Sequence, residues 1–270
     1  MATLGFIGAG NMATALCRGV VGAGLVPGDE VLAGDPDAAR RAAFEEATGA
    51  RTTPDNPEAC RAERLVLAVK PQVMPTVLAE LGPLLGADRL VISIAAGIPA
   101  AQIEAACEAP VRVVRAMPNT PMLVGAGAAA LCKGAHATDA DLARAAELFA
   151  ACGLVLEVDN EEQIHAVTAL SGSGPAYVFL LAELMARAGE ELGLAGADAV
   201  ALANQTVLGA GRMLAESAEP AAELRRRVTS PGGTTEAALR SMNENHVLES
   251  VVQAIHRACR RSQELADGEG

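Results

Sequence analysis

The stretch from Leu4 to Ala13 reads LGFIGAGNMA and decides the fold of the first half of the chain. Its first four residues form a short β-type run, and a G-x-G-x-x-A pattern follows from Gly8 to Ala13 and leads into a helical pattern. In this context Gly8 permits a tight turn, Gly10 lets a pyrophosphate approach the backbone, and Ala13 lets the helix pack closely on the strand. The stretch predicts a dinucleotide-binding loop with phosphates on the N–H groups at the helix start. The alternative is a tight turn that binds nothing.

Beyond this stretch, strand and helix patterns alternate up to about residue 160. The β-type runs consist mostly of Val, Ile and Leu, which suits strands that are buried on both faces of a sheet. The alternation predicts an α/β domain with a doubly wound, mainly parallel sheet at residues 1–160. We expect its strands at 4–7, 30–33, 65–69, 90–94, 111–114 and 154–156, and its helices at 12–22, 37–48, 73–84 and 139–152.

The second half of the chain, residues 161–270, carries only helical patterns. Its helix at 175–192 begins at Pro175, a residue suited to the first helical position. This helix is apolar around much of its circumference, so it needs cover on more than one side. A second copy of the chain or an ordinary intramolecular core could provide that cover. The other helices are expected at 160–170, 198–216, 221–228, 235–244 and 248–265.

Composition and charge exclude several classes of function. Hydrophobic residues make up 51% and charged residues 20% of the 270 residues, which supplies a core and excludes a disordered chain. The net charge of −12 has the wrong sign for binding a nucleic-acid backbone, and 2% aromatic residues leave few rings for stacking on bases. No apolar run approaches the ~20 residues that cross a bilayer, and no signal peptide pattern is present. We therefore expect a cytoplasmic protein with no nucleic-acid and no membrane partner.

The six cysteines are spread singly through the chain, and none forms a C-x-x-C pair. The four histidines include no pair at the i, i+4 spacing of metal ligands. We expect buried free thiols and no metal site.

The second predicted strand ends close to Asp35. An acidic side chain at this place typically binds the ribose hydroxyls of NAD and repels the 2′-phosphate of NADP. Arg40 and Arg41 follow and could reach a 2′-phosphate, and Asp35 could instead cap the following helix, which begins with Pro36. The choice between NADH and NADPH therefore stays open.

Three further loops follow predicted strands, at the edge where ligands bind in open α/β sheets. Pro and Gly also end strands without any ligand, but three such loops on one edge favour a bound cofactor. The loops are Val69-Lys70-Pro71-Gln72, Ile94-Ala95-Ala96-Gly97 and the stretch 115–121, which reads RAMPNTP.

In the helical half, the stretch from Val228 to Thr235 reads VTSPGGTT and opens a helix. Gly232 and Gly233 expose backbone N–H groups, Thr234 or Thr235 can cap the helix, and the positive helix end favours an anion. The stretch predicts a carboxylate-binding loop. A capped helix without a ligand is the alternative.

Taken together, these motifs resemble those of the pyrroline-5-carboxylate reductase family along almost the whole chain. The last two motifs, at their spacing and in their order, are the most specific. The resemblance rests on the Gly8–Ala13 loop, Val69-Lys70-Pro71-Gln72, Ala95-Ala96-Gly97, Met117-Pro118-Asn119-Thr120-Pro121, Ser171-Gly172-Ser173-Gly174-Pro175-Ala176-Tyr177 and Ser230-Pro231-Gly232-Gly233-Thr234-Thr235.

The resemblance implies an N-terminal Rossmann domain and a C-terminal helical dimerisation and substrate-binding domain, in a homodimer or a ring of dimers. It implies hydride transfer from NADPH or NADH to the imine carbon of (S)-1-pyrroline-5-carboxylate. The product would be L-proline, in the last step of proline biosynthesis.

The resemblance also implies roles for individual residues. Ser230, Gly233 and Thr234 would hold the substrate carboxylate, and Thr235, as the catalytic residue, would place its hydroxyl near the ring nitrogen. Tyr177 could line the substrate pocket or only pack against neighbouring side chains. Besides Asp35, the cofactor contacts would be Gly8, Ala9, Gly10, Asn11 and Met12 at the pyrophosphate, Asn56 and Lys70 at the ribose with Ala68 and Val69 beside them, and Ala95, Ala96 and Asn119 at the nicotinamide.

Two other functions stay open. One is a reductase of a related cyclic imine acid. The other is a non-catalytic, dinucleotide-binding redox sensor, which would need the glycine loop but not the stretch 230–235. A β-hydroxyacid dehydrogenase is disfavoured, because that family usually places a catalytic Lys in its helical domain and this helical half contains no Lys.

Overall fold

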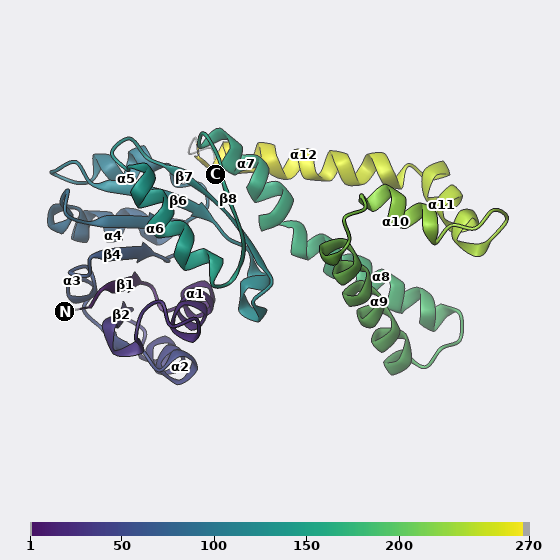
Figure 1. Cartoon of the computed structure of the whole chain (residues 1–270), viewed down its shortest axis with the longest axis horizontal. Helices are drawn as coiled ribbons and strands as arrows, with labels where there is room; N and C mark the ends of the chain where they lie inside the picture. The colour runs from purple at the N-terminus through teal and green to yellow at the C-terminus, as the bar shows by residue number, and fades with distance from the viewer. Residues whose placement is uncertain (1, 267–270) are drawn as a thin grey trace. The chain divides into compact units, whose positions relative to one another are not determined.

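The computed structural model describes residues 2–266, and within these residues eight strands form one sheet (Figure 1). The strand order is β3-β2-β1-β4-β5-β6-β7-β8. All neighbours are parallel except β6 and β7, so the predicted doubly wound, mainly parallel sheet is confirmed. The strands are β1 (Leu4–Ile7), β2 (Val31–Gly34), β3 (Arg51–Thr53), β4 (Arg64–Leu67), β5 (Leu90–Ser93), β6 (Arg112–Met117), β7 (Gly127–Lys133) and β8 (Gly153–Glu157).

Two of these strands, β3 and β7, are not predicted from the sequence. β3 has only three residues and lies at the edge of the sheet beside β2. β7 reads GAAALCK, so it lacks the β-branched and aromatic residues that mark a strand. Its extended conformation comes from pairing with β6 on one side and β8 on the other, which overrides the helix propensity of alanine.

Helices cover both faces of the sheet, and each face has its own hydrophobic core. Successive strand residues point to opposite faces, so Phe6 of β1 belongs to one core and Ile7 to the other. On the first face lie α1 (Asn11–Gly22), α2 (Ala38–Thr48) and α6 (Asp139–Ala150), and on the second α3 (Asn56–Ala59), α4 (Met74–Leu81) and α5 (Ala100–Ala105).

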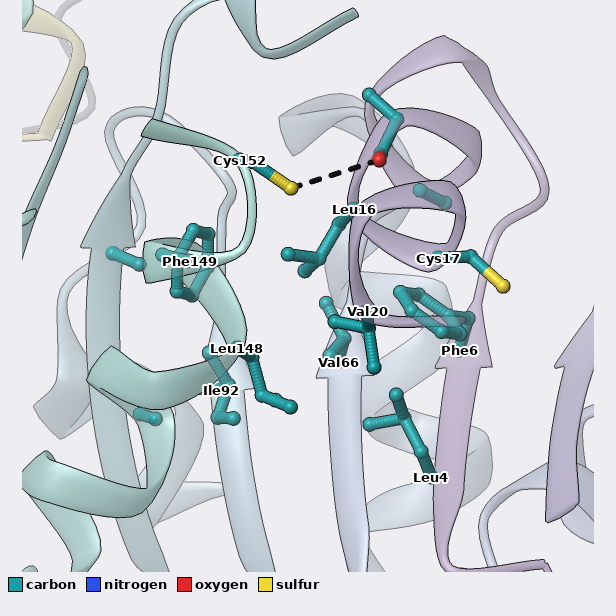
Figure 2. Close-up of a cluster of buried hydrophobic side chains, with 14 of the residues drawn as sticks. Leu4, Phe6, Leu16, Cys17, Val20, Val66, Ile92, Leu148, Phe149 and Cys152 are labelled. Atoms are coloured by element: carbon teal, nitrogen blue, oxygen red, sulfur yellow. Dashed lines mark hydrogen bonds between the residues drawn. The ribbon is translucent and has the colours of Figure 1, made fainter. Parts of the chain in front are cut away.

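Figure 2 shows the first core, in which Leu16 and Val20 of α1 meet Phe149 of α6 above the strands. Cys17 and Cys152 lie in the same core, and burial raises the pKa of Cys17 to about 11. All six cysteines are free, and four of them are buried. The prediction of buried free thiols holds for those four, while Cys107 and Cys259 are only partly buried.

Contacts divide the chain into two compact units. The first holds the chain up to Ser173 and again from Ala258, and the second holds Gly174–Arg257. α7 (Glu162–Val167) belongs to the first unit because its Ile164 packs with residues of β7. The boundary predicted after residue 160 lies close to the end of the sheet, since β8 ends at Glu157. As a boundary between domains it stays a prediction.

The second unit is all-helical, as predicted. It holds α8 (Gly174–Glu191), α9 (Gly196–Glu216), α10 (Ala221–Arg227), α11 (Thr234–Glu244) and the first part of α12 (Val247–Ala266). The last turns of α12 return to the first unit, where Ser262 Oγ lies 2.9 Å from His165 Nδ1 of α7, with both side chains buried.

The predicted helix start at Pro175 holds to within one residue, since α8 begins at Gly174, but the interval before it is helical rather than a loop. α7 and α8 are joined by a π-helical turn (Thr168–Gly172), in which the N–H of Ser173 donates to the oxygen of Thr168 at 2.8 Å. The resulting helical stretch from Glu162 to Glu191 is long and apolar enough, by length and composition alone, to cross a membrane, which the sequence analysis does not anticipate. The core helix of a soluble protein can be equally long and apolar.

Candidate functional site

The glycine loop joins β1 to α1 and leaves a helix N-terminus open. Gly8 has a φ of +98°, and a Cβ there would lie 3.0 Å from the backbone oxygen of Ala68, so the position requires glycine. α1 has Gly10 as its N-cap, and no side chain caps it. A Cβ on Gly10 would meet no atom within 4 Å. The first N–H groups of α1 therefore face open space and can bind an anion.

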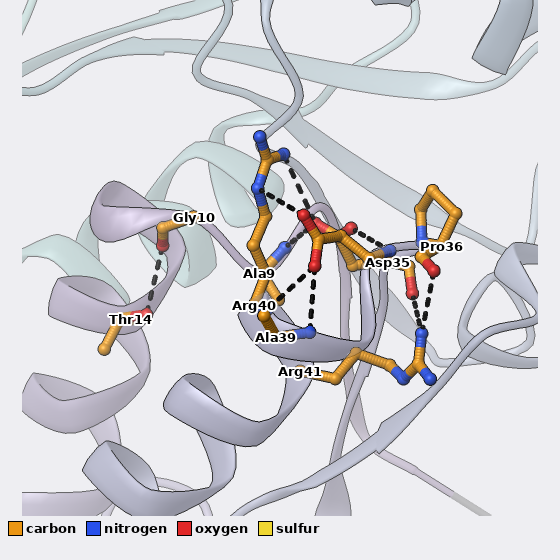
Figure 3. A network of polar contacts seen from close by, with 9 residues as sticks. Ala9, Gly10, Thr14, Asp35, Pro36, Ala39, Arg40 and Arg41 are labelled. Carbon is orange, nitrogen blue, oxygen red and sulfur yellow. Dashed lines mark hydrogen bonds and ion pairs between the residues drawn. The ribbon is translucent and has the colours of Figure 1, made fainter.

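Asp35 ties this loop to the end of β2. Its Oδ2 accepts the N–H of Ala9 at 2.9 Å, and its Oδ1 accepts the N–H of Asp37 at 2.9 Å (Figure 3). The alternative that Asp35 caps α2 is wrong, because Asp37 is the N-cap and accepts the N–H groups of Ala39 and Arg40. Asp35 is 3% exposed, so its carboxylate serves the protein's own backbone.

A cavity of about 890 Å³ opens at the carboxyl ends of β1, β2, β3 and β4. It lies beside β1, where the strand order reverses, which is the place where open α/β sheets bind their ligands. Of the predicted cofactor residues, it brings together Gly8, Gly10, Asn11, Met12, Asp35, Asn56, Ala68, Val69 and Lys70.

Asn56 provides a test of whether a dinucleotide fits this cavity. Its Oδ1 is buried and has no hydrogen-bond donor among the described residues, whereas its Nδ2 donates to Glu80 Oε2 at 3.2 Å. A buried acceptor without a donor costs about 1–3 kcal/mol, which a ligand hydroxyl can offset. Open helix N–H groups for phosphate, an acceptor for a ribose hydroxyl, and the cations Arg40 and Lys70 on one cavity fit a dinucleotide.

The cavity also contains residues that the sequence analysis does not assign. Some lie at or just after the carboxyl ends of β2 and β3, and others lie on one face of the helical segment that leads into and through α4. The residues of the second group recur at a helical spacing within a predicted helix. That spacing could have indicated that they share one face. The residues are Gly34, Pro36 and Pro54 in the first group, and Val73, Thr76, Val77 and Glu80 in the second.

Ala9, Ala95, Ala96 and Asn119 do not line this cavity. Ala95 and Asn119 follow the parallel strands β5 and β6, so they lie at the same edge of the sheet, farther from β1. Asn119 is buried, its Oδ1 accepts the N–H of Ala128 at 2.8 Å, and its Nδ2 donates to the oxygen of Ser171 at 3.1 Å. The structure thus joins Asn119 to the protein itself, and its predicted nicotinamide contact stays a prediction.

A proline four residues after Ser171 helps to leave its oxygen available to Asn119. In a regular helix the oxygen of Ser171 would accept the N–H of the residue four positions later, which is Pro175. Proline has no N–H, so this oxygen is free to accept from Asn119. The bond from Asn119 to Ser171 therefore joins the motif at 117–121 to the first residue of the motif at 171–177.

The stretch 230–235 lies in the second unit and opens α11. Gly232 has a φ of +70°, and the N–H of Gly233 donates to the oxygen of Ser230 at 3.0 Å, which closes the turn. The predicted cap by Thr234 or Thr235 is wrong, because Gly233 is the N-cap and no side chain caps the helix. The N–H groups of the first turn are thereby left open to an anion.

Glu236 is a neighbour of this loop that the sequence analysis misses. Its Oε2 accepts the N–H of Gly232 at 2.8 Å and so braces the turn from within α11. Glu236 is the third residue after the N-cap Gly233, the position from which the acid of a capping box reaches back, and this position could have indicated it.

Tyr177 borders a separate, largely apolar cavity of about 370 Å³ in the second unit, together with Leu184 and Val251. Within residues 2–266, no group of three or more His, Cys, Asp and Glu side chains is arranged to hold a metal ion.

Comparison with known proteins supplies the family. A model described as pyrroline-5-carboxylate reductase dimerisation matches residues 161–265, and one described as NADP oxidoreductase, coenzyme F420-dependent, matches residues 3–97. The pyrroline-5-carboxylate reductase of Pseudomonas aeruginosa is 48% identical over 98% of this chain and 97% of its own length. That of Synechocystis sp. is 42% identical over 97% of each chain.

Solved structures agree with these relatives. The structure of a pyrroline-5-carboxylate reductase from Coxiella burnetii covers 98% of both chains with a TM-score of 0.90 and 39% identity. A pyrroline carboxylate reductase from Plasmodium falciparum, solved with NADP bound, has a TM-score of 0.87 and 31% identity over 98% of both chains. From the glycine loop to α12, the chain is thus similar to one kind of protein throughout, and it belongs to the pyrroline-5-carboxylate reductase family.

Proposed function

We propose that this chain reduces (S)-1-pyrroline-5-carboxylate to L-proline with NADPH or NADH, the last step of proline biosynthesis. One observation carries the proposal: relatives named for this activity are 39–48% identical to the chain over nearly its full length. The cavity beside the glycine loop supports it, because its donors and acceptors fit a dinucleotide.

The reaction asks the protein for position and electrostatics rather than for a nucleophile. A protonated cyclic imine already accepts a hydride readily, so alignment of the two reactants provides most of the catalysis. When bound, NAD(P)H supplies that hydride. On the protein side, the N–H groups at the start of α1 hold the phosphates, and Asn56 Oδ1 accepts a ribose hydroxyl.

The stretch 230–235 is proposed to hold the substrate. The uncapped start of α11 offers N–H groups and a positive helix end to the carboxylate, together with the Ser230 hydroxyl. Thr235, the second residue of α11, is proposed to hydrogen-bond the ring nitrogen through its hydroxyl, which needs no change of protonation state.

We further propose a cytoplasmic homodimer or ring of dimers, with no nucleic-acid or membrane partner. The apolar side chains of α8 support self-association, because Phe179 and Leu180 are more than half exposed within one chain and Leu181 is 49% exposed. A second copy of α8 would bury them.

Identification of the product tests the proposed function. The purified protein, incubated with pyrroline-5-carboxylate and NADPH or NADH, should form L-proline in a one-to-one ratio with the oxidised dinucleotide, measured by chiral chromatography. Faster turnover of the six-membered cyclic imine would favour the related reductase. A protein that binds the dinucleotide and reduces neither imine would favour the redox sensor.

A further inference from the structure

Two arginines follow β2, and the structure gives them different surroundings. The Arg41 guanidinium donates to the backbone oxygens of Asp35 and Pro36, at 2.8 and 3.1 Å, and so is tied to the turn before α2. Arg40 lines the cavity instead, with 56% of its side chain exposed. Figure 3 shows the two side chains leaving the helix in different directions.

The Arg40 guanidinium keeps its donors available. Its nitrogens lie 3.9 Å from Asp35 Oδ2 and 3.6 Å from Asp37 Oδ2, which are ion-pair distances too long for hydrogen bonds. Both carboxylates already accept backbone N–H groups: Asp35 from Ala9 and Asp37, and Asp37 from the start of α2. The two acids therefore hold Arg40 near the cavity without saturating it.

Asp35 lacks the exposure that a ribose ligand needs. In dinucleotide sites that select NAD, the carboxylate after the second strand accepts the ribose hydroxyls. Here the Asp35 side chain is only 4% exposed, and each of its oxygens accepts a backbone N–H at 2.9 Å. Its oxygens thus serve the glycine loop and the turn before α2, and the Arg40 guanidinium, 3.9 Å from Oδ2, offsets part of its negative charge.

We propose that Arg40 binds the 2′-phosphate of NADPH and gives this chain a preference for NADPH over NADH, while Asp35 is a positioning residue for the glycine loop. The inference rests on the proposed function, because it needs a dinucleotide in the cavity. A guanidinium with free N–H groups matches two phosphate oxygens at once. The other cation of the cavity, Lys70, follows β4, on the opposite side of β1 from β2.

Binding measurements test the assignment without turnover. Isothermal titration of wild type, Arg40→Gln and Arg41→Gln with NADP⁺, NAD⁺ and 2′,5′-ADP compares loss of the cavity arginine with loss of its neighbour. Wild type should bind NADP⁺ more tightly than NAD⁺. Arg40→Gln should weaken the binding of NADP⁺ and 2′,5′-ADP by about 10- to 100-fold. It should change the affinity for NAD⁺ by less than about twofold. Arg41→Gln should change the affinities for NADP⁺ and NAD⁺ by the same factor.

Asp35→Asn tests the second half of the assignment. As a positioning residue, Asp35 should affect both dinucleotides by a similar factor, because both use the glycine loop; circular dichroism checks that the variant folds. A selective loss of NAD⁺ affinity would instead make Asp35 a ribose ligand and overturn its assignment.

Three results separate this inference from the proposed function. If wild type prefers NAD⁺, or if Arg40→Gln weakens NADP⁺ and NAD⁺ equally or not at all, the Arg40 assignment fails and the reductase proposal stands. If wild type binds neither dinucleotide, both proposals fail.

Discussion

At the residue scale, Thr235 is the residue proposed to act on the substrate nitrogen. It is the second residue of α11, next to the N–H groups that no side chain caps. A hydroxyl can donate or accept a hydrogen bond at the substrate nitrogen and keep that ability across the physiological pH range. Its contribution should therefore appear in catalysis and not in dinucleotide binding.

Thr235→Ala should lower kcat/KM for pyrroline-5-carboxylate by about 1–3 kcal/mol in transition-state terms and leave dinucleotide affinity near that of wild type. Steady-state kinetics and dinucleotide titration measure the two quantities. Thr229→Ala is the matched control, because that hydroxyl already donates to the oxygen of Arg225. Unchanged kinetics in Thr235→Ala would remove Thr235 from the mechanism.

The sequence predicts the identity of site residues better than their contacts. The G-x-G-x-x-A pattern indicates the loop that lines the cavity, since the positive φ of Gly8 belongs to the turn between strand and helix. It cannot show that Asp35 accepts the N–H of Ala9, or that Asn119 donates to Ser171, because these bonds join residues 26 and 52 positions apart. Only the folded chain brings such partners together.

At the element scale, α6 begins with a capping box whose acid is buried. Thr138 is the N-cap, its hydroxyl accepts the N–H of Asp141, and the Asp141 side chain accepts the N–H of Thr138. Burial alone would raise the pKa of Asp141, but hydrogen bonds from Thr138 and the charge of Arg112 hold this pKa below its ordinary value. The carboxylate therefore stabilises the folded state only while it is ionised.

Asp141→Asn should lower the free energy of unfolding by about 1–3 kcal/mol at pH 7, because an amide cannot accept all of these donors. The folded pKa lies below the unfolded one, so the contribution of Asp141 is complete above about pH 4 and is lost as the pH falls through the folded pKa. Urea unfolding of both proteins from pH 7 to pH 3 measures this. A constant difference between them across that range would contradict the assignment.

Strands and helices differ in how well the sequence predicts them. Runs rich in Val, Ile and Leu indicate β1, β4 and β5 because these strands are buried on both faces. The run of alanines in β7 carries no such signal, and its pairing with β6 and β8 decides its structure. The π-helical turn before α8 is equally hidden, since Gly and Pro there are typical of a break.

At the scale of the whole molecule, the exposed apolar side chains of α8 require a partner surface. Phe179 is 67% exposed, Leu180 is 53% exposed, and Ala186 alone is buried among the residues of this helix. An apolar face of this kind marks an interaction site. The dimerisation model that matches residues 161–265 covers this helix.

Phe179→Asp should shift the protein from oligomer toward monomer, because a buried unpaired carboxylate would destabilise the interface by several kcal/mol. Within one chain the side chain is already exposed, so the fold of the monomer should be retained. Sedimentation velocity across a dilution series measures the shift, with Leu25→Asp, a substitution at an exposed leucine of the first unit, as the control. A wild type that is monomeric at micromolar concentration would contradict this account of α8.

The most direct test of the central claim is the absorbance of reduced nicotinamide, followed with the purified protein and pyrroline-5-carboxylate in parallel reactions with NADPH and NADH. The account predicts rapid, substrate-dependent loss of absorbance, faster with NADPH at low cofactor concentration. No loss with either cofactor, from a folded protein that binds the dinucleotide, would contradict the claim that this chain is a pyrroline-5-carboxylate reductase.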